Sequence, residues 1–163
     1  MSKSLAIDQE VLFREYAHHV LITLVPYWGQ VYREIESGLA DYFPCSFMND
    51  PVLAEIAAKT VFNQDYIRNL DNNFKFSDFS PNAPYQHRGG IWGGAFWEIR
   101  QLLKPEVADR LLFSTWKTVT SNENLNDQGE NFVSILLEQA KSVEGGKYTT
   151  QIRSIFEARG LKL

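Results

Sequence analysis

The sequence is poor in the features that would mark a secreted, nucleic-acid-binding or membrane protein. Its 163 residues include one cysteine, Cys45, which excludes an internal disulfide framework. The formal net charge is −4 at pH 7, so the chain lacks the basic excess that non-specific nucleic-acid binding requires. The longest apolar run, around Val20–Val25, is far too short to span a bilayer. We therefore expect neither a nucleic acid nor a membrane as a partner.

The N-terminal stretch, residues 1–8, is short and polar and lacks the apolar centre of a secretory signal peptide. Together with the lone cysteine, this favours a cytoplasmic location. No internal repeat, low-complexity run or linker interrupts the chain, so residues 1–163 are predicted to form a single domain. Hydrophobic residues make up 44% of the chain and aromatic residues 13%, which is enough for a well-packed core.

Apolar residues recur at helical spacing along most of the chain, and no strong period-two segment is present, so the predicted class is mainly α. Asp8 is suited to cap the first helix, and Pro26 and Pro44 are expected to end the first and second helices. Residues 61–88 are expected to be irregular because they are rich in asparagine and proline. Helices are predicted over residues 7–23, 28–43, 51–58 and 89–103. Two more are predicted to begin at residue 105 and at about residue 127. The last is predicted to begin with Thr149 as its cap and to end at Gly160.

The first predicted helix carries a sequence that is close to a zinc-binding motif. Residues 14–18 read Arg-Glu-Tyr-Ala-His. Zinc peptidases carry His-Glu-x-x-His on a helix, where the two histidines hold the metal and the glutamate acts as general base. Glu15 and His18 match this pattern, but Arg14 cannot bind zinc because its guanidinium stays protonated and has no free lone pair. One mismatch in five residues also arises by chance on ordinary helices.

Three further segments accompany this motif in the same order along the chain. Residues 35–43 read Ile-Glu-Ser-Gly-Leu-Ala-Asp-Tyr-Phe, residues 86–100 contain His-Arg-Gly-Gly-Ile-Trp-Gly-Gly, and residues 155–161 read Ile-Phe-Glu-Ala-Arg-Gly-Leu. Together the four segments resemble the helical C-terminal lobe of the gluzincin metallopeptidases, the thermolysin-like and fungalysin-like group. The resemblance covers residues 8–161, and it implies one globular multi-helix domain of that type.

The resemblance also assigns roles to positions of the metal site. It implies that Ser37 stands where the family has its third zinc ligand, and a serine hydroxyl is a poor ligand for zinc. Asp41 matches a carboxylate that orients the first ligand histidine. Gln86 or His87, depending on a register choice of one residue, matches the histidine that steadies the oxyanion.

These assignments describe a site that has lost its metal. The catalytic positions that remain are Glu15 and His87, and the former metal positions are Arg14, His18 and Ser37. We expect no cofactor, with zinc only if the site has been rebuilt.

The residues left behind by the metal are expected to form ion pairs. We hypothesise that Arg14 makes a bidentate contact with Asp41 and that Glu15 or Glu36 pairs with His18. The alternative is that Arg14 is simply exposed to solvent.

The resemblance further implies a preceding lobe whose sheet edge binds substrate, and no such sheet is expected before the motif helix. The predicted function is therefore a pseudopeptidase, a non-catalytic domain that binds a protein partner or scaffolds an assembly. One alternative is a metal-dependent peptidase or hydrolase that has rebuilt its site from His18, Glu36, His19 or His87. A second alternative is a helical half-domain completed by a partner chain or by another copy of itself.

Two other groups of residues lead to structural predictions. Gly89-Gly90 and Gly93-Gly94 indicate close helix packing, and a phosphate loop is excluded because neither a preceding strand nor a Gly-Lys-Ser/Thr sequence is present. Glu98 and Arg100 are expected on a solvated face. The expected core aromatics, which would alternatively form an exposed docking patch, are Trp92, Phe96, Trp97 and Trp116.

Overall fold

In the computed structural model, the described residues are 8–26, 29–119 and 129–163, and this part of the chain is mainly helical, as the sequence predicts. None of the helices described is long and apolar enough to cross a membrane. The α-helices are α1 Gln9–Leu24, α2 Gln30–Met48, α3 Glu55–Ala57, α4 Tyr85–Leu102, α5 Pro105–Val119, α6 Glu130–Ala140 and α7 Thr149–Ala158. The remaining elements are β1 Val52–Leu53, β2 Arg68–Asn69, the π-helix η2 Ala58–Phe62 and the 3₁₀ turns η3 Phe76–Asp78 and η4 Val143–Gly146.

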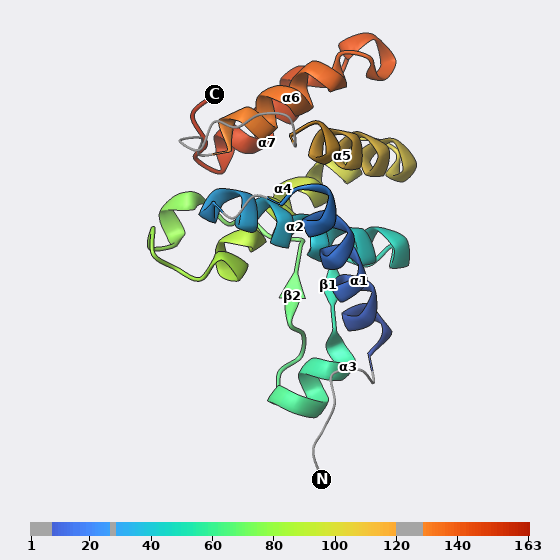
Figure 1. Ribbon diagram of the computed structural model, residues 1–163, viewed down its shortest axis with the longest axis vertical. Coiled ribbons are helices and arrows are strands. Elements are labelled where there is room, and N and C mark those ends of the chain that lie inside the picture. Colours follow the sequence, from blue (N-terminus) through green and yellow to red (C-terminus); the bar gives the residue numbers. More distant parts are fainter. Residues whose placement is uncertain (1–7, 27–28, 120–128) are drawn as a thin grey trace.

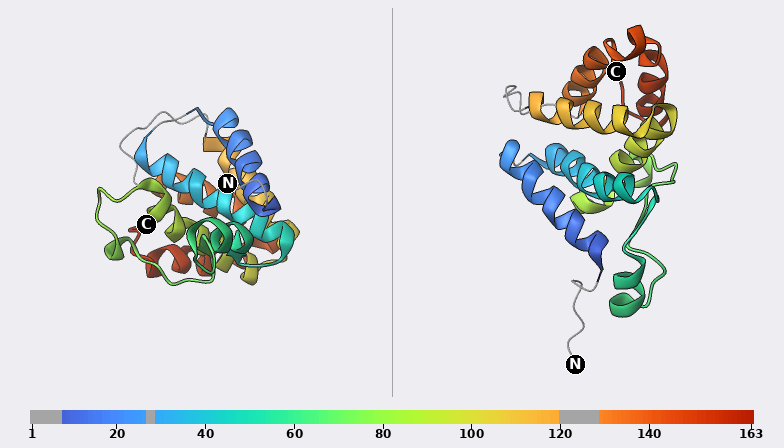
Figure 2. Two further views of the ribbon diagram at one scale, coloured as in Figure 1. Left: turned by 90° about the horizontal axis from the view of Figure 1, so that it is seen from below. Right: turned by 90° about the vertical axis from the view of Figure 1, so that its right-hand side faces the viewer.

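Helices α2 and α4 form the centre of the molecule (Figure 1). Helices α5, α6 and α7 gather at one end, while α1 lies along α2 (Figure 2). At the other end the antiparallel pair of β1 and β2, with Val52 opposite Asn69, projects and carries α3.

Glycines allow α2 and α4 to cross with their backbones almost in contact. A side chain at Gly38 of α2 would bring its Cβ within 2.7 to 2.9 Å of Trp92 Cβ and of backbone atoms of Gly89 and Gly93. A Cβ at Gly89 would likewise lie 2.9 Å from the side chain of Ser37. The predicted role of the glycines in helix packing is therefore confirmed for Gly89 and Gly93.

The aromatic residues fill the core between α4 and the C-terminal helices. The ring of Trp92 lies 5.8 to 6.2 Å from those of Phe96, Phe132 and Phe156. Trp116 is buried and donates a hydrogen bond from Nε1 to the carbonyl of Leu21, 3.0 Å away. All four aromatic residues predicted for the core are buried there, so they do not form an exposed docking patch.

Asp8 connects the start of α1 to the projecting hairpin. One carboxylate oxygen accepts a hydrogen bond from the backbone N–H of Glu10 at 3.0 Å, which caps α1 as predicted. The other oxygen accepts from the backbone N–H of Ala57 at 3.0 Å. Because Asp8 is only 2% exposed, this one carboxylate fixes the position of α1 relative to α3.

The prediction that Pro44 ends the second helix is wrong, because α2 continues through it to Met48. A proline inside a helix removes one backbone hydrogen bond, and here side-chain contacts on both sides of it compensate. Tyr42 Oη and Ser46 Oγ both donate to Asp109 of α5, at 2.6 and 2.7 Å. The helix instead ends where Asn49 adopts a left-handed conformation, with φ of 58°.

Residues 61–88 are more ordered than the sequence suggested. They include the end of η2, strand β2, the turn η3 and the first residues of α4, which begins at Tyr85 and not at Gly89. The two-residue strands β1 and β2 are too short to produce a period-two pattern. Gly89 and Gly90 lie inside α4, where Gly89 faces Ser37 of α2 and Gly90 faces the ring of Phe74.

The prediction that Arg100 lies on a solvated face is wrong, because Arg100 is only 6% exposed. Its Nε donates to Ser46 Oγ at 2.9 Å, and its guanidinium lies over the ring of Trp97. Glu98 is exposed, as expected.

The C-terminal helices follow the predicted order. Gly160, with φ of +96°, follows the end of α7, as expected for a glycine after a helix, although Tyr148 and not Thr149 occupies the cap position. The predicted helix start near Asp127 lies outside the described residues, within which α6 begins at Glu130.

Candidate functional site

Helix α1 turns charged residues toward α2. Arg14 Nε donates to Asp41 Oδ1 at 2.6 Å, and Asp41 is completely buried. Arg14 also donates from a terminal nitrogen to Glu15 Oε1 at 2.8 Å, while Arg68 Nε lies 3.5 Å from Asp41 Oδ2. The expected pair of Arg14 with Asp41 is thus present, but it is not bidentate, because Nε is the nitrogen of Arg14 that bonds to Asp41 and the other observed bond goes to Glu15.

His18 lies one helical turn after Arg14 and faces a second buried carboxylate. Its Nδ1 forms a hydrogen bond with Glu36 Oε1. The Glu36 side chain is 6% exposed, and burial raises the pKa of its carboxyl above the ordinary value, against the opposing effect of His18. Of the two partners proposed for His18, the structure selects Glu36, because the Glu15 side chain is 58% exposed and paired with Arg14.

Ser37 does not face His18. It is fully buried and packs against Gly89 of α4, where its Oγ would lie 2.9 Å from an added Cβ. Neighbouring residues on a helix differ in direction by about 100°, so only one of Glu36 and Ser37 points toward α1. The residue of α2 that faces the histidine is Glu36, while Ser37 lies against α4, and its match to the family's third zinc ligand stays a prediction.

The remaining predicted residues do not join this pair. His19 is exposed, and its carbonyl accepts a hydrogen bond from Thr23. Gln86 and the exposed His87 lie in the first turn of α4, on the wall of a separate pocket formed with residues 66–74. In the parts of the chain that the structure describes, no group of three His, Cys, Asp or Glu side chains is placed to hold a metal ion.

Comparison with known protein families, with characterised proteins and with solved structures gives no match. The gluzincin resemblance therefore rests on the sequence motifs alone and stays a prediction. The chemistry of the site has to be argued from the geometry of this chain.

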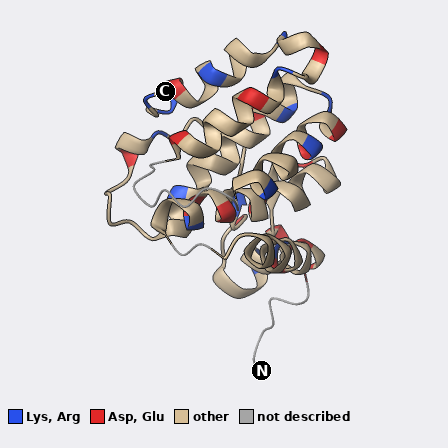
Figure 3. Cartoon of the chain, turned by 45° about the horizontal axis from the view of Figure 1, so that its top comes forward, with Lys and Arg blue, Asp and Glu red and all other residues tan. Residues whose placement is uncertain are grey.

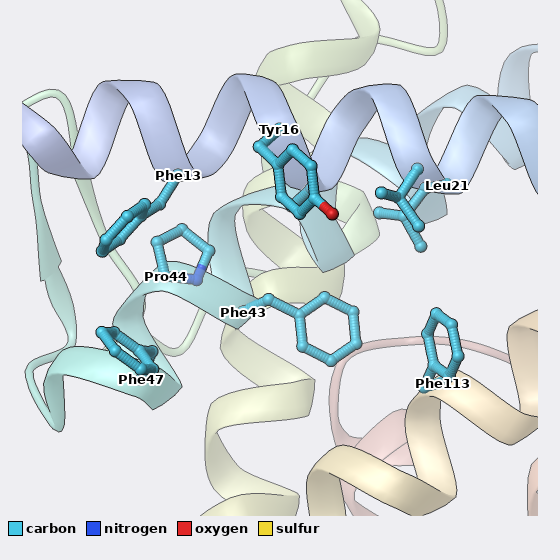
Figure 4. Close-up of a pocket in the computed structure, with 9 residues that line it drawn as sticks. Phe13, Tyr16, Leu21, Phe43, Pro44, Phe47 and Phe113 are labelled. Carbon is cyan, nitrogen blue, oxygen red and sulfur yellow. The ribbon is translucent and has the colours of Figure 1, made fainter.

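An apolar depression beside α1, which we call the aromatic groove, was not predicted from the sequence. It has a volume of about 310 Å³, and almost all of its exposed lining is apolar. Figure 4 shows side chains from α1, α2 and α5 converging on it. The lining residues are Phe13, Tyr16, Ala17, Val20, Leu21, Phe43, Pro44, Phe47 and Phe113.

Edge-to-face contacts hold the aromatic rings of the groove. The ring centroids of Phe13 and Phe47 are 5.4 Å apart, and those of Phe43 and Phe113 are 6.2 Å apart. Two rings nevertheless remain open to solvent, because Phe47 is 76% and Tyr16 70% exposed. Exposed aromatic residues gathered around one groove are typical of an interaction surface.

The arrangement of α1 explains why the groove is exposed. Arg14 and His18 occupy the side that faces α2, and Leu21 is the one fully buried residue of this helix. Phe13 lies on a neighbouring side, where it packs against the exposed ring of Phe47 of α2, and Tyr16 remains open to solvent. The sequence contained an indication of this exposure, because aromatic and charged residues are interspersed along this helix and its apolar residues do not form one continuous stripe.

Charge is spread evenly over the described elements. Lys and Arg residues alternate with Asp and Glu residues on most helices, and neither sign gathers on one face in this view (Figure 3). Electrostatics therefore gives no indication of a highly charged partner.

Proposed function

We propose that this chain is a non-catalytic, peptidase-like domain that acts by binding an apolar segment of another polypeptide in the aromatic groove. The peptidase-like part of the proposal rests on the sequence motifs. Arg14 supports the proposed loss of catalysis, because it stands at a ligand position of the family motif and pairs there with the buried Asp41. A cation fixed at this position repels a metal ion.

The observation that carries the binding function is the orientation of α1. This helix directs Arg14 and His18 toward α2 and leaves Phe13 and Tyr16 on the rim of an apolar groove. Desolvating these rings would be favourable, at roughly 25 cal/mol per Å² of apolar surface. Tyrosine and phenylalanine are also the residue types enriched at the centres of protein interfaces.

Site-specific cross-linking tests the proposed surface. A photoreactive phenylalanine analogue replaces Phe47 in one variant and Glu138, an exposed residue of α6, in the control. We expect a discrete adduct with another polypeptide from position 47 alone. The purified partner should bind the Tyr16→Ala variant about tenfold more weakly than the wild-type chain, as for a hot-spot residue.

Three outcomes would contradict the proposal. Adducts in equal yield from both positions, or none from either, would show that the groove is not a specific surface. An adduct between two copies of the chain would favour the self-completed half-domain. Zinc bound in stoichiometric amount together with peptide hydrolysis would favour the rebuilt enzyme.

The peptidase ancestry has its own test, the Arg14→His variant. This change places a second imidazole one turn before His18, and Glu36 is already in contact with His18. We expect the Arg14→His variant to bind one zinc ion per chain and the Arg14→Gln variant to bind none. Elemental analysis after dialysis measures the zinc content. Equal zinc contents in the two variants would contradict a former metal site at this position.

A further inference from the structure

A second cavity is lined in part by His18 and shares no lining residue with the aromatic groove. It is relatively enclosed and has a volume of about 70 Å³. A water molecule takes up roughly 30 Å³ of liquid, so the cavity holds a group of a few heavy atoms. Four helices contribute to its wall, α1 with His18, α2 with Arg33 and Glu36, α4 with Tyr85, and α5 with Trp116.

Arg33 supplies a positive charge to this wall. Its guanidinium carbon lies 4.2 Å from the centre of the Tyr85 ring, and within the described parts of the chain no carboxylate pairs with it. Stacking on an aromatic face fixes the guanidinium plane and leaves the N–H groups at its edge free. These donors suit the planar, bidentate geometry of a carboxylate.

His18 supplies a second donor with a fixed direction. Glu36 binds Nδ1 of the ring, and Nε2 has no hydrogen-bond partner among the described residues. The proposed site uses the pair with two protons, one between Glu36 and Nδ1 and one on Nε2, in which the pair is neutral and Nε2–H donates. The wall of the cavity then carries a net charge of +1, from Arg33. This charge favours a singly charged anion over phosphate.

The rest of the cavity is mostly apolar. Ile22 of α1, Val25, Pro26 and Trp116 line it, together with Tyr32 of α2. A ligand that fits therefore combines one negative group with a short hydrocarbon substituent. We propose that this cavity binds a carboxylate with a small apolar substituent, held by Arg33 and His18. Such a carboxylate is present in short-chain organic acids and at the C-terminus of a polypeptide.

The proposal is independent of the function assigned to the aromatic groove, and a titration of the full-length chain tests it. Amide chemical shifts of the ¹⁵N-labelled protein are recorded with butyrate, with the neutral analogue butyramide and with inorganic phosphate. We expect saturable binding of butyrate, with shifts at residues 18, 33 and 85, and at least about tenfold weaker binding of the other two probes.

Two variants assign the contact. Arg33→Gln removes an exposed charge and should weaken butyrate binding about tenfold or more, while the matched control Arg153→Gln, an exposed arginine of α7, should not. His18→Gln should also weaken binding. Butyrate binding that equals butyramide binding, or that survives Arg33→Gln unchanged, would overturn the proposal.

A pair of peptides distinguishes the two sources of the carboxylate. A short acetylated peptide that ends in an apolar residue is titrated as its free acid and as its amide. Tighter binding of the free acid than of butyrate assigns the site to a polypeptide C-terminus. Tighter binding of butyrate assigns it to a small organic acid.

Discussion

Asp41 is the residue on which the contact between α1 and α2 depends. It is fully buried, and a buried carboxylate is tolerated only with a compensating charge. Arg14 supplies that charge, and Arg68 approaches from the hairpin at 3.5 Å. Burial, the largest single effect, lowers the pKa of Arg14, but the charges and hydrogen bonds of Asp41 and Glu15 together outweigh it, and the net pKa is raised.

We predict that Arg14→Met lowers the free energy of unfolding by about 3 kcal/mol, because the substitution leaves the buried Asp41 without its main partner. Urea denaturation followed by circular dichroism measures this change. The control is Glu15→Gln, which alters an exposed partner of the same arginine and should cost less than about 1 kcal/mol. Similar losses in the two variants would contradict the role given to Asp41.

At the scale of elements, the crossing of α2 over α4 sets the geometry of the site. Gly38 allows the two backbones to meet, and this contact buries Ser37 against α4. The neighbouring Glu36 is then turned toward His18. The pairing of Glu36 with His18 is thus a consequence of packing on the opposite side of α2.

We predict that Gly38→Ala destabilises the protein by about 2 kcal/mol. Alanine is favoured over glycine within a helix by roughly 0.5–1 kcal/mol, but the added Cβ would lie 2.8 Å from the backbone nitrogen of Gly93, which cannot move alone. Thermal and urea unfolding measure the net effect. Gly90→Ala, whose Cβ would lie 3.5 Å from the nearest atom, a ring carbon of Phe74, should remain within about 0.5 kcal/mol of the wild type. A stabilised Gly38→Ala variant would be incompatible with this crossing.

For the molecule as a whole, buried weak acids limit stability at alkaline pH. Burial raises the pKa of the Cys45 thiol, and nearby carboxylates add to the rise. Burial also raises the pKa of Tyr42, whose hydroxyl donates to Asp109. Both groups stay neutral in the folded state and ionise in the unfolded state at their ordinary pKa values, so the stability they preserve at neutral pH is lost as pH rises.

We predict that the free energy of unfolding is insensitive to these groups below about pH 8.5 and falls above it. Each group contributes up to about 1.4 kcal/mol per pH unit once it ionises in the unfolded chain. Denaturant titrations at pH 7.5, 9 and 10 measure the slope, which should be smaller between pH 9 and 10 in Cys45→Ala. Equal slopes in the variant and the wild type would show that Cys45 does not contribute.

The pairing of Arg14 with Asp41 was expected from the family resemblance. The sequence by itself determined the mainly helical class, the cap formed by Asp8 and the burial of the tryptophans. Each of these follows from local spacing or from the charge of one residue type, which a linear pattern records. It did not determine the continuation of α2 through Pro44 or the burial of Arg100, because contacts with residues far along the chain decide both.

The tertiary structure alone decided which side chains face each other. Glu36 and Ser37 are adjacent, and only the close crossing at Gly38 directs the first toward His18 and the second into the interior. The aromatic groove likewise exists only because three helices bring Phe13, Phe47 and Phe113 together. Local propensity fixes each helix, but the rotation of one helix against another is set by packing, and on that rotation both candidate sites depend.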